Sequence, residues 1–528
     1  MNDNSKEKLQ GTNPNVSDSQ RPPQRHQNVQ KSECSKKGTK RNYPRKNRNG
    51  AGLDATNRDN DPNWYFEDAS VASQAASISF NQFQGEPFTI NQISADGIIE
   101  RAINVANLFI ARVNPSAGDT SSVTSGINLA ALKTFTTLSS RNAKTTQYAP
   151  QDLTTLLLAL GEVVSIAEHI RRAFGLAFTY NVRNRDLPRQ LLLELGFNAD
   201  DLFKGLADYR LRFNTIVTSI NKIPFPANIA YLFKCADIYQ HIYVDSNSPM
   251  AELIALAPYS TWTLDEAYSS AGTGLRTTAL PSNTAPFGDW LDLLSNMTSV
   301  IMQSATFNYV YADVLNYADK TGAKLIFLDY LSEAYSVFPE FNQNFLLQIH
   351  NATWLGAPTG TASTPTYTIE NDVAPNADKN KVDYIPLFQV NEGVAPTSVI
   401  LDLPDANPST ENIIEATRFT MIPWLNNGDN VLSLAFSDHY IVSFSIKKNG
   451  VGAYSITSSW RNVDAPTAAD VEIPCDLAQL DWAPQIYMDY SPSKALFNSG
   501  DLNYFTTIEY NWLNRVNDLT FQALFNLR

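Results

Sequence analysis

Few residues of this sequence are grouped in a way that suggests catalysis. Asp200 and Asp201 come closest to a pair of acids for hydrolysis. Adjacent helix residues point about 100° apart, and both acids fall where a capped helix favours negative charge, so a structural role is the stronger interpretation. Glu168 and His169 could serve acid–base chemistry, but the five histidines of the chain are isolated, so we expect His169 to be an exposed helical residue or a hydrogen-bonded one at the edge of the core.

Signatures of cofactor and metal chemistry are also missing from the sequence. It contains no Gly-x-x-x-x-Gly-Lys-Ser/Thr phosphate loop, no His-Glu-x-x-His zinc motif and no Gly-x-Ser-x-Gly nucleophile motif. Gly272-Thr273-Gly274 lacks the third glycine of a dinucleotide site, and we predict a turn there. Cys34, Cys235 and Cys475 lack metal-site spacing and are too few for a disulfide framework, which indicates a reducing compartment. We therefore expect no catalytic residue, cofactor or metal.

Chemistry of another kind is available near the N-terminus, where basic residues concentrate. Residues 1–50 carry 12 Lys or Arg against 4 Asp or Glu, although the whole chain has a net charge of −13. A solubilising tail or a localisation signal would explain the basic run alone, but the acidic body favours contact with nucleic-acid phosphates. The residues that we expect to contact nucleic acid are Lys31, Lys36, Lys37, Lys40, Arg41, Arg45, Lys46 and Arg48.

Residues 1–62 hold almost no large apolar side chains and are rich in Asn, Gln, Ser and Pro. Such a segment cannot bury enough surface to offset the entropy lost on ordering, so we predict a disordered arm. The charge changes sign at its end, where Asn57, Asn60 and the Asp61–Pro62 bond lie in a stretch that we expect to be exposed to cleavage.

The elements that must position these residues are mostly helices. The clearest pattern lies in residues 150–243, where apolar residues recur at intervals of three and four. Gly196 suits the left-handed end of a short helix, Asn198 can cap the next, and Gly322 follows the last turn of the helix at 305–319. No apolar run is long enough to span a bilayer. The predicted helices cover 69–78, 95–113, 127–139, 150–174, 187–195, 199–220, 227–242, 286–303, 305–319, 323–335 and 501–527.

Short strings between residues 180 and 280 carry a family resemblance through their order and spacing. The strings are Tyr209-Arg210, Phe213-Asn214, Ile223-Pro224-Phe225-Pro226, Ile242-Tyr243-Val244-Asp245 and Gly272-Thr273-Gly274-Leu275. In this order they resemble the matching region of picobirnavirus capsid proteins. The resemblance implies a non-enveloped icosahedral shell of symmetric dimers that encloses double-stranded RNA and the viral polymerase. It further implies assembly in the host cytoplasm, a place in the virion and contact with a membrane during entry. Some relatives in this family lose an N-terminal peptide by their own action, and Asn57, Asn60 and the Asp61–Pro62 bond offer groups for such self-cleavage here. Ordinary proteolysis of an exposed tail is the alternative.

The C-terminal third predicts short strands at 384–390, 398–403, 431–437 and 440–448. Asn449-Gly450 supplies the residues of a type I′ turn and predicts a hairpin. The fold class that we expect is mainly α, a multi-helix shell domain with a smaller β-rich region. Its parts are an RNA-contacting arm (1–62), a helical shell domain (63–365), a β-rich projection or dimer contact (366–480) and a C-terminal helical segment returning to the shell (481–528).

Two other classes of protein remain open at this point. The 23 tyrosines and 8 tryptophans could line the groove of a helical carbohydrate-binding surface protein, although such residues more often belong to cores and interfaces. A hydrolase with an unrecognised site is the second alternative. A capsid would elute from a sizing column as a megadalton particle, whereas the alternatives would elute as small species.

Overall fold

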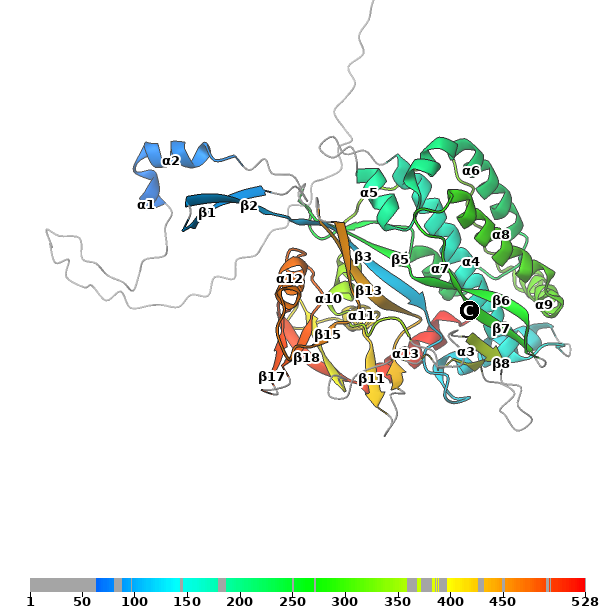
Figure 1. Cartoon of the computed structure of the whole chain (residues 1–528). Helices are drawn as coiled ribbons and strands as arrows, with labels where there is room; N and C mark the ends of the chain where they lie inside the picture. The colour runs from blue at the N-terminus through cyan, green and yellow to red at the C-terminus, as the bar shows by residue number, and fades with distance from the viewer. Residues whose placement is uncertain are drawn as a thin grey trace, which may run out of the picture. The chain divides into compact units, whose positions relative to one another are not determined.

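The computed structural model describes most of the chain from residue 63 onwards (Figure 1). The chain divides into two compact units, Met1–Phe80 and Asn81–Arg528. The described residues are 63–79, 88–95, 97–142, 146–178, 187–248, 251–269, 272–358, 368–371, 382–384, 386, 388, 397–425, 432–448, 452–490, 493 and 495–527.

The described part of the first unit consists of two short helices, α1 (Asn63–Phe66) and α2 (Ala69–Ala76). The side chain of Asp68 begins α2 by accepting a hydrogen bond from the backbone N–H of Ser70. No residue of α2 is buried, and Tyr65 is exposed as well. The helix predicted at 69–78 is confirmed.

A five-stranded sheet organises the second unit, in the order β14-β13-β3-β5-β4. Its long strands β3 (Ala106–Pro115) and β13 (His439–Lys448) pair antiparallel, and β5 (Leu253–Pro258) runs parallel to β3. The edge strands are β14 (Gly452–Ile456) and β4 (Tyr243–Val244). Because these strands come from three distant parts of the sequence, the sheet joins the beginning, middle and end of the unit.

The helix predicted over 95–113 is wrong, because this stretch forms β2 (Gly97–Ile103) and β3. The residues from Ala106 to Val113 form an almost continuous apolar run. Such a run fits a buried helix and a strand covered on both faces equally well, so periodicity alone cannot separate the two.

The side chains of β3 alternate between two hydrophobic cores. Leu108 and Ile110 pack with the large helices, whereas Phe109 and Ala111 pack with the core on the opposite face of the sheet. This alternation is the period of two that a strand imposes on its side chains. Both faces of the central strand are therefore covered.

One face of the sheet carries a cluster of helices around α4 (Pro150–Ala177). By length and hydropathy α4 could cross a membrane, but its whole apolar window is buried inside this protein. It is the core helix of the cluster. The surrounding helices are α3 (Gly126–Asn142), α5 (Leu187–Glu194), α6 (Ala199–Ile220), α7 (Ala230–Asp237), α8 (Phe287–Gln303) and α9 (Ala305–Thr321).

The helix ends predicted from single residues are confirmed. Gly196 has a φ of +99°, in the left-handed region, just after α5. The side chain of Asn198 accepts a hydrogen bond from the N–H of Asp201 and caps α6. Gly322, at the end of α9, has a φ of +69°. These positions need a residue without a Cβ or a short polar acceptor, and the sequence supplies it.

The other face of the sheet packs against α10 (Gln343–His350), α12 (Ala468–Leu477) and the buried ring of Trp354. Smaller sheets complete the unit. One consists of β6 (Ser260–Ser269), β7 (Gly272–Ala279), β8 (Thr368–Asn371) and β9 (Val382–Asp383). Two are pairs: β10 (Ser398–Leu403) with β18 (Tyr504–Glu509), and β11 (Ile422–Leu425) with β12 (Leu432–Ala435). Another consists of β15 (Trp460–Asn462), β16 (Tyr487–Tyr490) and β17 (Ala495–Asn498). The remaining helices are α11 (Thr410–Ala416) and α13 (Tyr510–Leu524).

The helix predicted over 323–335 is absent, and the segment instead runs extended along α6. Asn214 of α6 accepts a hydrogen bond from the N–H of Leu331 at 2.8 Å and donates one to its carbonyl at 3.0 Å. Asn221 does the same for Leu328, at the same two distances. Helix side chains thus satisfy the backbone groups that an intrasegment helix would otherwise have to pair.

Two further expectations change in detail. The helix predicted over 501–527 begins only at Tyr510, because the aromatic and β-branched residues before it form β18 and pair with β10. Gly272-Thr273-Gly274, predicted as a turn, is the start of β7. The hairpin predicted at Asn449-Gly450 is confirmed by the pairing of β13 with β14. Lys448 lies opposite Gly452, so three residues connect the strands; these lie outside the described part of the chain.

The second unit is rich in helix, as predicted, but the sheet at its centre was not. β13 and β14 lie in the predicted β-rich region 366–480 and pair directly into the sheet of β3 and β5. Helix α13 packs against α3 of the helical cluster. A boundary near residue 365 therefore does not separate two hydrophobic cores. The use of 366–480 as a projection or dimer contact stays a prediction.

Candidate assembly surfaces

The residues predicted to bind RNA all lie outside the described part of the chain, as do Asn57, Asn60 and Asp61–Pro62. The basic set comprises Lys31, Lys36, Lys37, Lys40, Arg41, Arg45, Lys46 and Arg48. Their role rests on the charge of the sequence. The structure therefore bears on function through the surfaces of the second unit.

The acids and histidine considered for catalysis each have a separate structural environment. Asp200 forms an ion pair with Arg189 at 3.0 Å, and Asp201 accepts hydrogen bonds from the Tyr209 hydroxyl at 2.7 Å and the N–H of Phe287. These contacts lower the pKa of both carboxyl groups. His169 is completely buried in the core of the helical cluster, not exposed or at its edge as predicted. Among the described residues, no three His, Cys, Asp or Glu side chains converge as metal ligands.

One buried polar cluster was not anticipated from the sequence. Asp438 accepts hydrogen bonds from the Ser437 hydroxyl at 2.7 Å and Lys234 Nζ at 2.5 Å, and His439 Nδ1 lies 2.8 Å away from its other oxygen. Burial would raise the pKa of Asp438, but Lys234 and His439 hold it well below its usual range. The serine bonds to the acid and not to the histidine, so no nucleophile–base pair forms. The cluster ties α7 to the start of β13.

One exposed apolar feature of the second unit is the hairpin of β1 (Phe88–Ser94) and β2. The two strands pair antiparallel, with Ile93 opposite Ile98. Every residue of β2 is exposed, and Ile93 and Ile98 are 87% and 73% exposed. In Figure 1 the hairpin extends beyond the start of β3, away from the helices around α4. Ile90, Ile99 and Ile103 are exposed as well.

A hairpin with this composition is not stable on its own in water. Two strands without a third strand or a helix against them are marginal, and each exposed isoleucine forgoes roughly 1.5–3 kcal/mol of burial free energy. The register also places exposed isoleucines on both faces of the ribbon. An apolar surface of this kind marks a site of contact with another molecule.

A second exposed apolar surface lies on the extended segment 325–341 beside α6. Phe327, Tyr330 and Phe338 are exposed there, and the rings of Phe327 and Tyr330 meet edge to face with centroids 5.8 Å apart. The hydrogen bonds from α6 fix the backbone beneath these rings. The unit therefore offers more than one surface on which copies of the chain could pack.

Comparison with known proteins supports a role of this chain in assembly. The family model described as "Picobirnavirus, Capsid protein" matches residues 64–457. The chain belongs to the picobirnavirus capsid proteins. A curated relative, the capsid protein precursor of human picobirnavirus strain Human/Thailand/Hy005102, is 24% identical over 547 residues, covering 97% of this chain and 98% of the relative.

The fold of this capsid protein is also similar to a solved structure, the X-ray crystallographic structure of the picobirnavirus capsid. The match has a TM-score of 0.74 at 20% identity and covers 88% of this chain and 98% of that one. The family recognised from the strings between residues 180 and 280 is thus confirmed, and the match extends well beyond them.

The exposed hairpin is the surface that sequence reasoning missed. Residues 97–103 fall in the helix predicted over 95–113, and in such a helix their isoleucines would be expected to face the core. The available signal was Gly97, which follows Asp96 between two runs of β-branched residues and suits a hairpin turn. Its φ of +115° confirms that a glycine is favoured at this point.

Proposed function

We propose that this structural capsid protein assembles through homodimers into a closed, non-enveloped icosahedral shell around double-stranded RNA, with its basic arm in contact with the RNA. The observation that carries the dimer is the exposed isoleucine hairpin. A second copy of the chain is the partner that a capsid protein meets at the highest local concentration. Burial of Ile93 and Ile98 in that contact would explain why they are tolerated on the surface of one subunit.

The dimer is tested by placing charge on the hairpin. Ile93→Lys with Ile98→Lys should abolish dimers and particles, because neither ammonium group can be buried in an apolar contact. The matched control, Asn91→Lys with Gln92→Lys, adds the same charge to polar positions of the same hairpin. Sedimentation velocity and negative-stain microscopy give the readout. Normal particles from the isoleucine variant would refute the role of the hairpin, and a native chain that elutes only as a small species would refute the capsid assembly itself.

The proposed RNA contact rests on the eight basic residues from Lys31 to Arg48. If about six phosphates are neutralised, log affinity should fall with log salt with a slope of roughly −4 to −5. Neutralising Lys36, Lys37, Lys40, Arg41, Arg45 and Lys46 together should abolish RNA packaging and leave particles intact. Unchanged RNA content in those particles would contradict the proposal.

Two further partners and a location follow from the family. We propose that the shell encloses the viral polymerase, that it forms in the host cytoplasm and becomes the virion, and that it contacts a membrane during entry. Co-expression should place the polymerase in the particle fraction. Purified particles should release dye from phosphatidylcholine vesicles, and intact vesicles after prolonged incubation would contradict the membrane contact.

The arm is also proposed to be removed after assembly. The curated human relative is named a precursor, and the junction of the arm with the body contains Asn57, Asn60 and Asp61–Pro62. Self-cleavage would give one sharp N-terminus between about residues 45 and 66, only in assembled particles and also with protease inhibitors present. N-terminal sequencing and intact mass decide the matter. A full-length chain in mature particles excludes cleavage, and ragged, inhibitor-sensitive ends indicate external proteases.

A further inference from the structure

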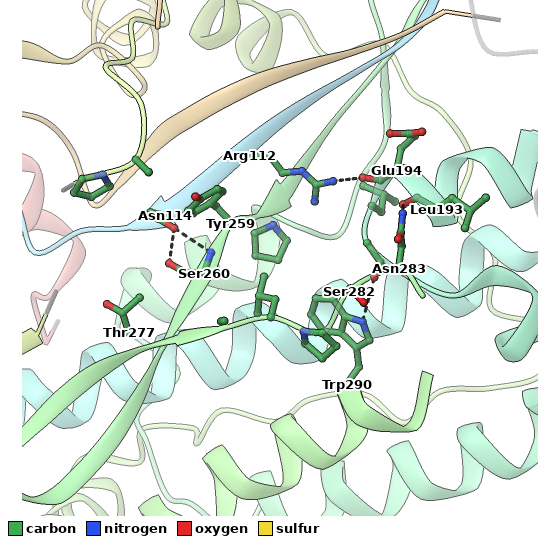
Figure 2. Close-up of a pocket in the computed structure, with 18 residues that line it drawn as sticks. Arg112, Asn114, Leu193, Glu194, Tyr259, Ser260, Thr277, Ser282, Asn283 and Trp290 are labelled. Carbon is green, nitrogen blue, oxygen red and sulfur yellow. Dashed lines mark hydrogen bonds between the residues drawn. The ribbon is translucent and has the colours of Figure 1, made fainter. Parts of the chain in front are cut away.

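A cavity of about 840 Å³ opens in the second unit between the end of α5, the β5–β6 corner and the segment that leads from β7 to α8 (Figure 2). Its lining is apolar on one side, with the side chains of Leu193, Leu280, Pro281 and Trp290 among its residues. Arg112 lines the same cavity and comes from β3. It is the one residue of β3 that is not fully buried.

The guanidinium of Arg112 has no carboxylate partner among the described residues. Nη2 donates a hydrogen bond to the backbone carbonyl of Glu194, as Figure 2 shows. The carboxylate of Glu194 attracts the Arg112 guanidinium, but its direct ion pair is with Lys447 Nζ at 2.9 Å. Burial lowers the pKa of Arg112, which reflects the cost of holding its charge away from water.

A second buried guanidinium lies behind the first. Arg172 of α4 is completely buried and donates hydrogen bonds to the carbonyls of His241 at 2.9 Å and Leu256 at 2.7 Å. Within the described part of the chain it likewise forms no ion pair with an acid. Burial lowers its pKa to about 10, and repulsion from Arg112 contributes in the same direction. Buried charges in proteins are normally paired with a direct partner. Arg172 adds positive charge near Arg112, and the carboxylate of Glu194, which offsets part of the charge of Arg112, forms no direct ion pair with it.

The geometry of the lining places this charge next to an aromatic ring. A Cβ built on Gly196 would lie 3.6 Å from the Trp290 ring and 3.9 Å from Arg112 Nη1, so both groups lie beside the same backbone position. The indole N–H of Trp290 donates to the carbonyl of Gly196 at 3.3 Å, which fixes the ring. The polar groups of Asn114 are already used, by Ser260 and by the Tyr440 hydroxyl. Arg112 is thus the cationic side chain among the described residues that line the cavity.

We propose that this cavity binds a small organic anion, whose carboxylate or phosphate pairs with Arg112 and whose apolar body lies against Trp290, Leu280 and Pro281. A carboxylate or phosphate accepts two parallel hydrogen bonds from a guanidinium, and the desolvated surroundings strengthen the pair. The volume of the cavity falls within the range of small-molecule sites. The site is independent of the dimer contact, because none of its lining residues belongs to the β1–β2 hairpin.

The test uses three probes on the full chain by titration calorimetry: octanoate, its neutral counterpart 1-octanol, and inorganic phosphate. Octanoate should bind at least tenfold tighter than 1-octanol and tighter than phosphate. Arg112→Gln should remove the difference between octanoate and 1-octanol, whereas Arg141→Gln, which removes an exposed arginine of α3, should preserve it. Equal binding of octanoate and 1-octanol, or a difference that survives in Arg112→Gln, would overturn the site.

A second variant keeps the proposal testable if Arg112→Gln does not fold. Ala279 lines the cavity and is exposed on β7, so Ala279→Trp should fill the space without disturbing the core. It should weaken octanoate and 1-octanol by tenfold or more, with the thermal midpoint unchanged. Unaltered octanoate binding in Ala279→Trp would place the ligand elsewhere, and phosphate that binds as tightly as octanoate would exclude the apolar subsite.

Discussion

The strands β2 and β3 follow one another in the chain with two residues between them, yet their surroundings are opposite. Every residue of β2 is exposed, whereas nine of the ten residues of β3 are buried. Both strands contain isoleucine and alanine, and β-propensity does not separate them. The difference lies in the partners: β3 pairs with β5 and β13 and is covered on both faces, while β2 pairs with β1 alone.

This contrast shows that the apolar content of a segment does not reveal where its burial takes place. The isoleucine of β3, Ile110, contributes to the folding of one subunit. In the proposed dimer, the isoleucines of β2 contribute to contact with a second copy of the chain, so they affect association more than folding. Variants in the two strands should therefore change different measured quantities.

The largest effect is expected from a matched pair of truncations. Ile110→Ala removes a side chain that is 1% exposed and should lower the free energy of unfolding by about 2–5 kcal/mol, because it leaves a cavity between β3 and the helices. Ile98→Ala, at a position 73% exposed, should change it by less than about 0.5 kcal/mol and weaken dimers instead. Urea unfolding and sedimentation velocity measure the two effects. Equal losses in the free energy of unfolding from Ile110→Ala and Ile98→Ala would contradict the difference between the two strands.

The next effect is a pH dependence of the free energy of unfolding, which arises from a carboxyl group buried in the helical cluster. Glu162 of α4 accepts a hydrogen bond from the Thr261 hydroxyl at 2.8 Å, and burial raises its pKa from 4.5 to about 7, against the influence of His439. The folded state therefore binds this proton more tightly than the unfolded state. The resulting stability, about 3 kcal/mol, is complete below pH 4.5 and is lost as pH rises towards 7.

Glu162→Gln should remove that pH dependence, so its free energy of unfolding should fall less than that of the native chain between pH 4.5 and 7. The control is Glu100→Gln in the exposed hairpin, which should leave the profile unchanged. Urea unfolding at several pH values gives the measurement. A native profile in Glu162→Gln would show that this carboxyl stays ionised in the core.

A smaller effect is expected where α6 holds the extended segment. Asn214→Asp replaces the donor to the Leu331 carbonyl by an oxygen, so two acceptors face each other. The loss should be about 1–3 kcal/mol and should appear as faster local hydrogen exchange at Leu331. Asn296→Asp, an exposed change of the same chemistry on α8, should cost far less. Unchanged protection at Leu331 would show that the amide pair does not hold the segment.

The smallest effect comes from two glycines with positive φ. Gly97 has a φ of +115° and Gly322 of +69°, and a Cβ on either would meet no atom within 4 Å, so only backbone strain results. Gly322→Ala should lower the free energy of unfolding by about 1 kcal/mol. Gly97→Ala should leave the free energy of unfolding unchanged and weaken the dimer roughly fivefold, which is the effect of about 1 kcal/mol of backbone strain at the hairpin. The reverse pattern would mean that the hairpin belongs to the fold of one subunit.

The helical cluster could be predicted from the sequence because its signals are local. The periodicity of α4, the cap at Asn198 and the left-handed glycines Gly196 and Gly322 each depend on a few neighbouring residues. The resemblance of ordered strings to picobirnavirus capsid proteins supplied the family. Both hold in the structure and in the comparisons.

The central sheet could not be predicted because its signal is not local. Whether Ala106 to Val113 form a helix or a strand depends on β5 and β13, which follow much later in the chain. The extended course of 323–335 depends on Asn214 and Asn221 in a distant helix. The same dependence hid the cavity, because nothing in the sequence near Arg112 indicates that its neighbours in space include Trp290.

The order of the strands in the central sheet has a consequence for synthesis on the ribosome. Asn114 of β3 and Tyr440 of β13 are hydrogen-bonded side chains 326 residues apart in the chain. At translation rates of about 5–20 residues per second, β3 waits roughly 15–65 s for its antiparallel neighbour. During that interval the exposed hairpin and the open edge of β3 belong to the same nascent chain. Nascent chains on neighbouring ribosomes of one messenger RNA therefore expose apolar strands to one another before either chain is complete.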